Sequence, residues 1–281
     1  LDKKTWSEGV LPQMAKLMNV DVLYDPFSNT SADTVIRIKP ADLFPSEKWN
    51  KIEKYYLAAA PEKPLQRKAE LPQVKPELKN FTVHFISAKF KNPLTTFVQI
   101  DTAAKKISFA DGGEEKLFVY NADMKMTDSA IVPKGTVAIN TEDNTQKILS
   151  MGVLTPSDEK LGRLWFSNNY KNKKIILDSL QRPVHIGYAD LNNDGRQDMI
   201  VCEFGYHSGA LSWFENIDGS HYAKHILRAL PGAVSTEVYD FNKDGKPDII
   251  ALMAQADEGV FIYYNQGNGN FKEEKVLSFP P

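Results

Sequence analysis

The sequence contains a single cysteine, Cys202, and no C-x-x-C-H motif. These absences exclude an internal disulfide, a cysteine-rich zinc site and covalent attachment of a c-type haem to this chain. Cys202 closes the apolar run 199–202, so we interpret it as a small buried hydrophobic residue and not as a catalytic thiol. This chain by itself supports no haem cofactor.

Long hydrophobic runs and an excess of charge of one sign are also missing. No apolar run reaches the roughly 18 residues of a membrane-spanning helix, so we expect no transmembrane segment. Lys and Arg number 34 and Asp and Glu number 36, which gives a net charge of −2 at pH 7. Nucleic-acid-binding domains usually carry a basic excess, so this balance argues against a nucleic-acid partner. With 281 residues, of which 42% are hydrophobic, the chain can bury a sizeable core.

Three zones follow one another along the chain. Residues 1–60 are predicted to be mainly helical, with a helix capped by Ser46 that runs to about Ala60 and an earlier helix over 5–18. Residues 61–80 hold four prolines among many charges, which is typical of an extended linker. Residues 81–281 are predicted to be entirely β.

The β zone is repetitive. Four aromatic-rich segments each end in an asparagine, and the separations are 47, 48 and 49 residues. Further strand-like segments flank them, and four short strands per unit at a period near 48 indicate blades of a β-propeller. Trp165 and Trp213 stand three residues before their asparagines, where the last copy has Ile262, so we interpret them as core wedges and not as a ligand platform. The asparagines are Asn121, Asn168, Asn216 and Asn265, and the expected blades are about 81–125, 126–175, 176–229 and 230–281.

The pattern D-x-N-x-D-G-x-x-D occurs twice, over 190–198 and 240–248. Positions one, three and five place oxygen side chains around one point, glycine at six permits a sharp turn, the carbonyl at seven points inward and position nine adds a carboxylate. Oxygen-only ligation suits Ca²⁺, whereas metal-free polar turns would crowd repelling carboxylates. We therefore predict two calcium sites. Their ligands are Asp190, Asn192, Asp194, Arg196 (carbonyl) and Asp198, then Asp240, Asn242, Asp244, Lys246 (carbonyl) and Asp248.

These loops do not form an EF-hand. Position twelve is Val201 in one copy and Ala251 in the other, where an EF-hand requires a bidentate glutamate. With the asparagine-terminated strands, the loops resemble the FG-GAP/VCBS repeat family, which is also found in the integrin α-subunit propeller. The resemblance implies a β-propeller with calcium held between the first two strands of a blade. The first two repeats read 101–105 and 140–144 at this point and lack the motif, so we predict no metal there.

A second resemblance concerns residues 5–20 and 47–64, which are similar to the later part of bacterial c-type cytochrome domains. It implies Met14 or Met18 as a haem ligand only if an attachment motif lies upstream; core packing is the interpretation that we favour. The chain begins at Leu1 with neither an initiator methionine nor a signal-peptide pattern. We expect a processed or trimmed part of a longer protein, and the four visible blades form a whole ring, a truncated larger ring or a ring that partners complete.

The function that these features favour is a non-enzymatic binding or scaffold module, secreted, periplasmic or on the cell surface, for a protein or glycan partner. The expected contact loops are 206–208 and 255–258, which follow the second strands of two blades. Neither a nucleophile elbow nor a zinc-like histidine spacing is present. Two alternatives remain: an electron-transfer protein or oxidoreductase with an upstream haem segment, and a polysaccharide-active enzyme with paired carboxylates.

Overall fold

The computed structural model describes residues 1–18, 20, 44–63, 82, 90 and 93–278. The chain divides into two compact units, Leu1–Phe81 and Thr82–Pro281, which are described separately. Within the described ranges, no helix is both long enough and apolar enough to cross a membrane. Most of the linker predicted over 61–80 lies outside the described residues.

The N-terminal unit is helical. Its elements are α1 (Lys3–Thr5), η1 (Trp6–Val10), α2 (Leu11–Leu17) and α3 (Ser46–Ala59). The wide π-turn η1 ends two residues before Pro12, which has no backbone N–H to donate to an α-helical ladder. The predicted cap of α3 was wrong by one residue. Pro45, in extended conformation, is the N-cap, no side chain caps the helix, and Ser46 is its first helical residue.

A small apolar cluster holds these helices together. Leu11, Ala15, Val20 and Trp49 are buried, and Met14 and Met18 are among the partly buried residues packed against them. The Trp6 ring stacks on the Tyr56 ring with centroids 4.3 Å apart. Both methionines therefore have the packing environment that the core interpretation expects.

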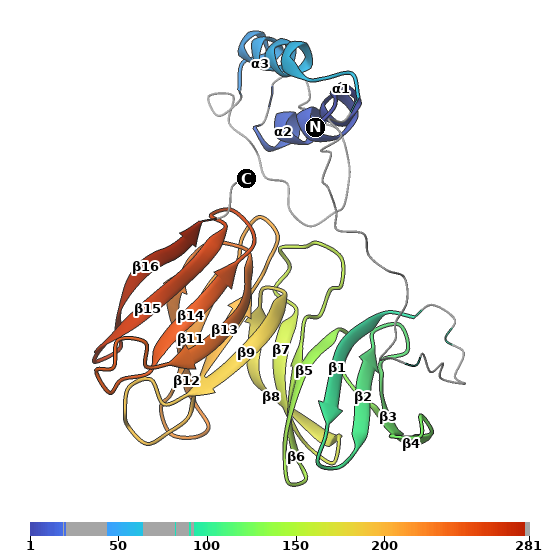
Figure 1. Ribbon diagram of the computed structural model, residues 1–281, viewed down its shortest axis with the longest axis vertical. Helices are drawn as coiled ribbons and strands as arrows, with labels where there is room; N and C mark the ends of the chain where they lie inside the picture. The colour runs from blue at the N-terminus through green and yellow to red at the C-terminus, as the bar shows by residue number, and fades with distance from the viewer. Residues whose placement is uncertain (19, 21–43, 64–81, 83–89, 91–92, 279–281) are drawn as a thin grey trace. The chain divides into compact units, whose positions relative to one another are not determined.

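The second unit is built from four-stranded antiparallel sheets, four of them among the described residues, and each is a simple meander. Figure 1 shows them following one another in chain order. We call them blades 1 to 4. Blade 1 contains β1 (Thr95–Asp101), β2 (Lys106–Asp111), β3 (Lys116–Asn121) and β4 (Met126–Ile131), and blade 2 contains β5 (Thr136–Glu142), β6 (Thr145–Ser150), β7 (Gly162–Asn168) and β8 (Lys171–Leu180). Blade 3 contains β9 (Pro183–Ala189), β10 (Asp198–Glu203), β11 (Ala210–Asn216) and β12 (Tyr222–Arg228), and blade 4 contains β13 (Ala233–Tyr239), β14 (Asp248–Met253), β15 (Gly259–Gly267) and β16 (Asn270–Ser278).

The chain is therefore mainly β with propeller-like blades and a small helical N-terminal unit, which confirms the fold class predicted from the repeats. Two strand positions differ from the expectation. β4 pairs with β3, so blade 1 ends at Ile131 and not near residue 125. β6 ends at Ser150 instead of continuing to residue 154, because the chain turns at Gly152, where φ is +80° and a Cβ atom would lie 2.6 Å from the Leu161 carbonyl oxygen.

Apolar side chains fill the spaces between successive blades. The first strands contact one another in the order β1, β5, β9 and β13. Ile200 and Trp213 of blade 3 pack with Ile249 and Phe261 of blade 4, and Trp213 is 2% exposed. Burial of each such side chain contributes about 1.5–3 kcal/mol. Since each blade buries its faces against its neighbours, the wedge interpretation of Trp213 agrees with its position.

The repeated asparagines have a local role at the end of the third strand. Asn216 Oδ1 accepts the N–H of Gly219 at 2.6 Å, and Asn265 Oδ1 accepts that of Gly267 at 2.9 Å. Both glycines have positive φ. In blades 3 and 4, the asparagine therefore closes the turn that leads to the fourth strand.

Candidate functional site

The two nine-residue motifs lie in equivalent loops of blades 3 and 4. Residues 190–197 connect β9 to β10, and residues 240–247 connect β13 to β14. The ninth residue of each motif, Asp198 or Asp248, begins the second strand. Both motifs thus stand between the first two strands of a blade.

In the first loop, side-chain oxygens converge on two backbone amides. Asp190 Oδ1 accepts the N–H of Asp194 at 3.1 Å and Asp190 Oδ2 accepts that of Gly195 at 2.8 Å. Asn192 Oδ1 accepts the same Asp194 N–H at 3.2 Å. Asn193 and Gly195 have φ of +61° and +82°, which bends the backbone around the carboxylate of Asp190. The oxygens of positions one and three therefore face a common point.

The second loop has the same pattern of hydrogen bonds. Asp240 accepts the N–H of Asp244 at 3.1 Å and that of Gly245 at 2.9 Å, and Asn242 Oδ1 accepts the Asp244 N–H at 2.9 Å. Lys243 and Gly245 have positive φ, as in the first loop. Two segments with different residues at the variable positions thus adopt one geometry, which the shared Asp, Asn and Gly residues impose.

A positively charged side chain lies on the position-five carboxylate in each loop. Arg196 Nη2 donates to Asp194 Oδ2 at 2.5 Å, and Lys246 Nζ donates to Asp244 Oδ2 at 3.0 Å. The Lys246 side chain and backbone N–H hold the pKa of Asp244 below its ordinary value. Burial raises the pKa of Asp194, but hydrogen bonds, first that of the Arg196 N–H, lower it on balance. In each loop, the side chain of position seven therefore compensates the negative charge of the position-five carboxylate.

The position-nine carboxylates are fully buried, and each connects its loop to the third strand. Asp198 accepts the N–H of Leu191 at 3.1 Å and that of Asn216 at 2.8 Å. Burial raises the pKa of Asp198, and these backbone hydrogen bonds oppose the rise. Asp248 makes the equivalent pair of bonds with its own loop and strand. Each oxygen has a second lone pair, so a structural role for Asp198 and Asp248 is compatible with the predicted ligation.

The donor set fits a hard cation. The converging side chains offer only carboxylate and amide oxygens, which are calcium ligands. Among the described residues, no three His, Cys, Asp or Glu side chains form a metal-binding group. A site in these loops would therefore combine its carboxylates with asparagine and carbonyl oxygens.

Besides Asn216, which accepts from Arg196 Nε and donates to the Gln197 carbonyl, two further residues outside the motifs contact the first loop. Asn265 of blade 4 donates from Nδ2 to the carbonyl of Leu191 at 2.7 Å, and this bond joins blade 4 to the loop of blade 3. Glu215 Oε1 accepts from Asn192 Nδ2 at 3.1 Å. The repeat pattern marked Asn265 as a strand end, but it carried no signal for a contact 74 residues away. Nothing in the sequence marked Glu215.

The predicted contact loops meet at the opposite end of the strands from the metal loops. Gln255 Nε2 donates to the carbonyl of Tyr206 at 2.8 Å. Asp158 of blade 2 accepts the backbone N–H groups of His207 and Ser208, each at 2.9 Å. The rings of Tyr206 and His207 lie 4.0 Å apart, and Tyr206 is 37% exposed. Loops of three blades thus form one surface, to which sequence reasoning did not assign Asp158.

Two other expectations concern single residues. Cys202 is buried, and burial raises the pKa of its thiol to about 12, which agrees with the interpretation as an inert core residue. His221 and His225 pair with different carboxylates, those of Asp218 at 2.7 Å and Glu215 at 2.8 Å. The two histidines therefore do not contact the same carboxylate.

Comparison with known families adds one firm result. Residues 190–251 and 240–281 match the family model of the FG-GAP-like repeat. The matches begin at Asp190 and Asp240, the first residues of the two loops, and together cover blade 4 and all of blade 3 except β9, about a third of the chain. They support an FG-GAP-type repeat in this part. They do not extend to the helical unit, so its cytochrome-like resemblance gains no support.

Comparison with curated proteins gives no significant match. Solved structures align at low similarity. A nidogen/laminin complex aligns with TM-score 0.42 and 11% identity over 67% of each chain. A hydrazine synthase from Kuenenia stuttgartiensis aligns with TM-score 0.41 and 9% identity over 65% of this chain and 54% of that one, and an endo-arabinase from Bacteroides thetaiotaomicron with TM-score 0.40 and 12% identity over 68% and 82%. The chain thus spans little more than half of the hydrazine synthase chain, and these alignments carry no functional argument.

Proposed function

We propose that the β unit is a calcium-stabilised, propeller-type binding module without catalytic activity, with one Ca²⁺ in the loop 190–198 and one in the loop 240–248. The observation that carries the proposal is the repetition. Loops at the same place in two consecutive blades share one hydrogen-bond pattern around the oxygens of positions one and three. Bound calcium supplies the positive charge that Arg196 and Lys246 otherwise bring to position five.

The affinity expected for such loops suggests a structural role outside the cytosol. Extracellular calcium modules bind with dissociation constants on the order of 10⁻⁴–10⁻³ M. At these affinities, a site is filled only where calcium is abundant. The bound ion would then hold the loop against the third strand. A secreted, periplasmic or cell-surface location is therefore part of the proposal.

The partner surface in this proposal is the loop end around Tyr206 and Gln255. Its exposed aromatic pair is supported by hydrogen bonds from blades 2 and 4, so little ordering is needed when a partner binds. Exposed aromatic residues on fixed loops are typical of surfaces that recognise proteins or glycans. No observation on the described residues favours the haem-dependent or polysaccharide-cleaving alternatives.

Thermal unfolding with and without calcium tests the proposal. With about 10 mM calcium and a dissociation constant on the order of 10⁻⁴ M, each site adds about 2.7 kcal/mol to the free energy of unfolding. We expect calcium to raise Tm, and the double variant Asp194→Ala/Asp244→Ala to lose this gain.

The matched control is Asp101→Ala, which changes an aspartate in the equivalent turn of blade 1, where no metal is predicted. This variant should keep the full calcium-dependent gain. Equal Tm values in calcium and in chelator for the unchanged protein would contradict the proposal.

A further inference from the structure

One buried side chain contacts both acidic loops. Asn265 lies in β15 of blade 4 and is 1% exposed. Its Nδ2 donates at 2.7 Å to the carbonyl of Leu191, the second residue of the first loop, and at 3.1 Å to the carbonyl of Pro247, the eighth residue of the second. Its backbone N–H donates to Asp248 Oδ1 at 2.8 Å. Asn265 therefore holds backbone or side-chain groups of two loops at once.

These bonds form a continuous path between the two position-nine carboxylates. Asp198 Oδ2 accepts the N–H of Leu191 at 3.1 Å, and the carbonyl of the same residue accepts from Asn265. The N–H of Asn265 then reaches Asp248. All four residues are at most 2% exposed, so water does not compete for the bonds, which polarise one another. A shift of either carboxylate therefore alters bonds on which the other loop depends.

The first loop also depends on blade 4 for its packing. The side chain of Leu191 is 2% exposed and belongs to the apolar cluster that contains Ile249 and Phe261 of blade 4. Phe241, the corresponding residue of the second loop, is 37% exposed. The start of the first loop is thus fixed by the blade that follows it.

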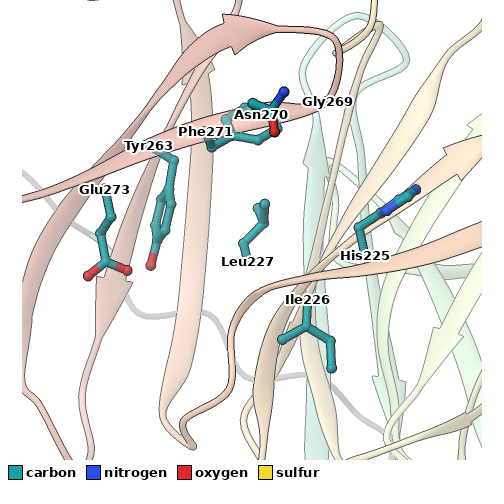
Figure 2. A pocket seen from close by; sticks show the side chains of 8 residues that line it. All are labelled: His225, Ile226, Leu227, Tyr263, Gly269, Asn270, Phe271 and Glu273. Atoms are coloured by element: carbon teal, nitrogen blue, oxygen red, sulfur yellow. The ribbon is translucent and has the colours of Figure 1, made fainter.

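Toward the outer strands, the contact between the same two blades is interrupted. A cleft opens between β12 of blade 3 and β15–β16 of blade 4, and Leu227, Tyr263 and Phe271 are among the residues that line it (Figure 2). The ion pairs of Arg228 with residues 257 and 273 also cross between the blades here, but they involve neither loop. Among the described residues, the bond from Asn265 to Leu191 is the hydrogen bond that joins blade 4 to the first loop.

The asparagine at the same place in blade 3 has only the local bonds. Asn216 donates its N–H to Asp198 at 2.8 Å and its Nδ2 to the Gln197 carbonyl at 3.1 Å, which are the bonds that Asn265 makes within blade 4. Blade 2 has no acidic loop, and within the described part of the chain Asn216 Nδ2 makes no bond to that blade. Asn216 therefore provides a matched comparison for the bond between blades.

We propose that Asn265 is a positioning residue for both calcium sites and couples them, so that two ions bind with positive cooperativity. This inference rests on the proposed calcium function. When the second loop is ordered around its ion, Pro247 and Asp248 fix the amide of Asn265 against Leu191, next to Asp190. The first loop then loses less conformational freedom when its own site is filled. By reciprocity, a filled first site favours the second by the same factor.

Isothermal titration calorimetry of the full chain with calcium chloride tests the coupling. Asp244→Ala keeps only the first site, and Asp194→Ala keeps only the second. Because one neutral hydrogen bond crosses between the blades, the product of the two binding constants of the unchanged protein should exceed the product of the constants of these single-site variants roughly fivefold.

The same three titrations are repeated with Asn265→Ala and with the matched control Asn216→Ala. Asn265→Ala should reduce the ratio to about one, because the path between the loops is broken. Asn216→Ala should weaken the first site but keep the ratio, because it loses bonds within blade 3 only. The comparison of the single-site variants needs no change at Asn265, so it decides the coupling even if Asn265→Ala does not fold.

Three results would contradict the inference, and they are distinguishable. A ratio of about one in the unchanged protein, or a smaller ratio from repulsion between the ions, would overturn the coupling and leave the proposed function standing. A ratio that Asn265→Ala leaves unchanged would overturn the role of this residue. If the unchanged protein bound no calcium, the proposed function would be wrong and the coupling with it.

Discussion

Blades 1 and 2 differ from blades 3 and 4 in how their first two strands are joined. Short turns, 102–105 and 143–144, connect β1 to β2 and β5 to β6, whereas the loops 190–197 and 240–247 make the same connection in the later blades. All four sheets nevertheless have the same strand order. A blade therefore forms without the acidic loop. Where the loop is present, its extra residues need contacts that hold them against the blade.

One buried position in the second strand follows this difference. Ile148, Ile200 and Ile250 occupy equivalent positions in the second strands of blades 2, 3 and 4, because each pairs with the residue three positions before the repeated asparagine. The residue two positions before this isoleucine is Gln146 in blade 2, Asp198 in blade 3 and Asp248 in blade 4. Gln146 holds its own blade, because its Oε1 accepts from Ser167 and from the Tyr170 N–H. The two aspartates instead hold a loop amide and a strand amide. A buried carboxylate at this register thus accompanies a long loop.

Substitution of this anchor should have the largest effect. Asp248→Ala leaves the part-buried N–H of Phe241 and the buried N–H of Asn265 without acceptors, and each unsatisfied buried donor costs about 1–3 kcal/mol. We expect a loss of about 3 kcal/mol in the free energy of unfolding. Urea unfolding followed by circular dichroism measures it.

Gln146→Ala is the comparison in blade 2, where only one backbone N–H loses its acceptor. Its expected cost is about 1–2 kcal/mol, which includes the loss of side-chain packing. If Asp248→Ala and Gln146→Ala lowered the free energy of unfolding by the same amount, the proposed difference between a side chain that fixes a loop and one that fixes only its own blade would be wrong.

A smaller, pH-dependent effect is expected at the interface of blades 3 and 4. His185 Nδ1 faces the N–H of Thr236 at 3.4 Å, and burial lowers the pKa of His185 below its ordinary value, while the Glu237 carboxylate opposes this in part. The unfolded chain therefore takes up a proton at this residue before the folded chain does. Stability present above about pH 6.5 should decrease as the pH falls below that value.

His185→Gln should flatten this part of the pH profile, with a change smaller than that of Asp248→Ala. Denaturant midpoints between about pH 7.5 and 5 measure it, in the range where histidines titrate. The other four histidines of the sequence remain in the variant and provide the background. A profile identical to that of the unchanged protein would remove His185 from the account.

Local patterns accounted for much of the fold. The ends of three third strands were predictable, because β3, β7 and β11 end at Asn121, Asn168 and Asn216, each followed by a polar turn, whereas β15 continues past Asn265 to Gly267. The turn geometry of the acidic loops was also local, because Asp190 caps amides only four and five residues ahead. The extended conformation of Pro45, by contrast, showed that a serine before a helical pattern does not always provide the cap.

Contacts between blades were not predictable from such patterns. The bond from Asn265 to Leu191, the support of residues 207 and 208 by Asp158, and the cleft between β12 and β16 all join segments about 40 residues apart or more. They depend on how one blade packs on the next. At position seven, the sequence predicted a role only for the backbone carbonyl. In the structure, the side chains of Arg196 and Lys246 also pair with the position-five carboxylates.

The most direct test of the central claim is the number of calcium ions bound per chain, measured by equilibrium dialysis and atomic emission. The unchanged protein and Asp101→Ala should bind two ions. Asp194→Ala and Asp244→Ala should each bind one, and the double variant none. Binding that does not saturate at two ions, or a count that these substitutions leave unchanged, would contradict the account.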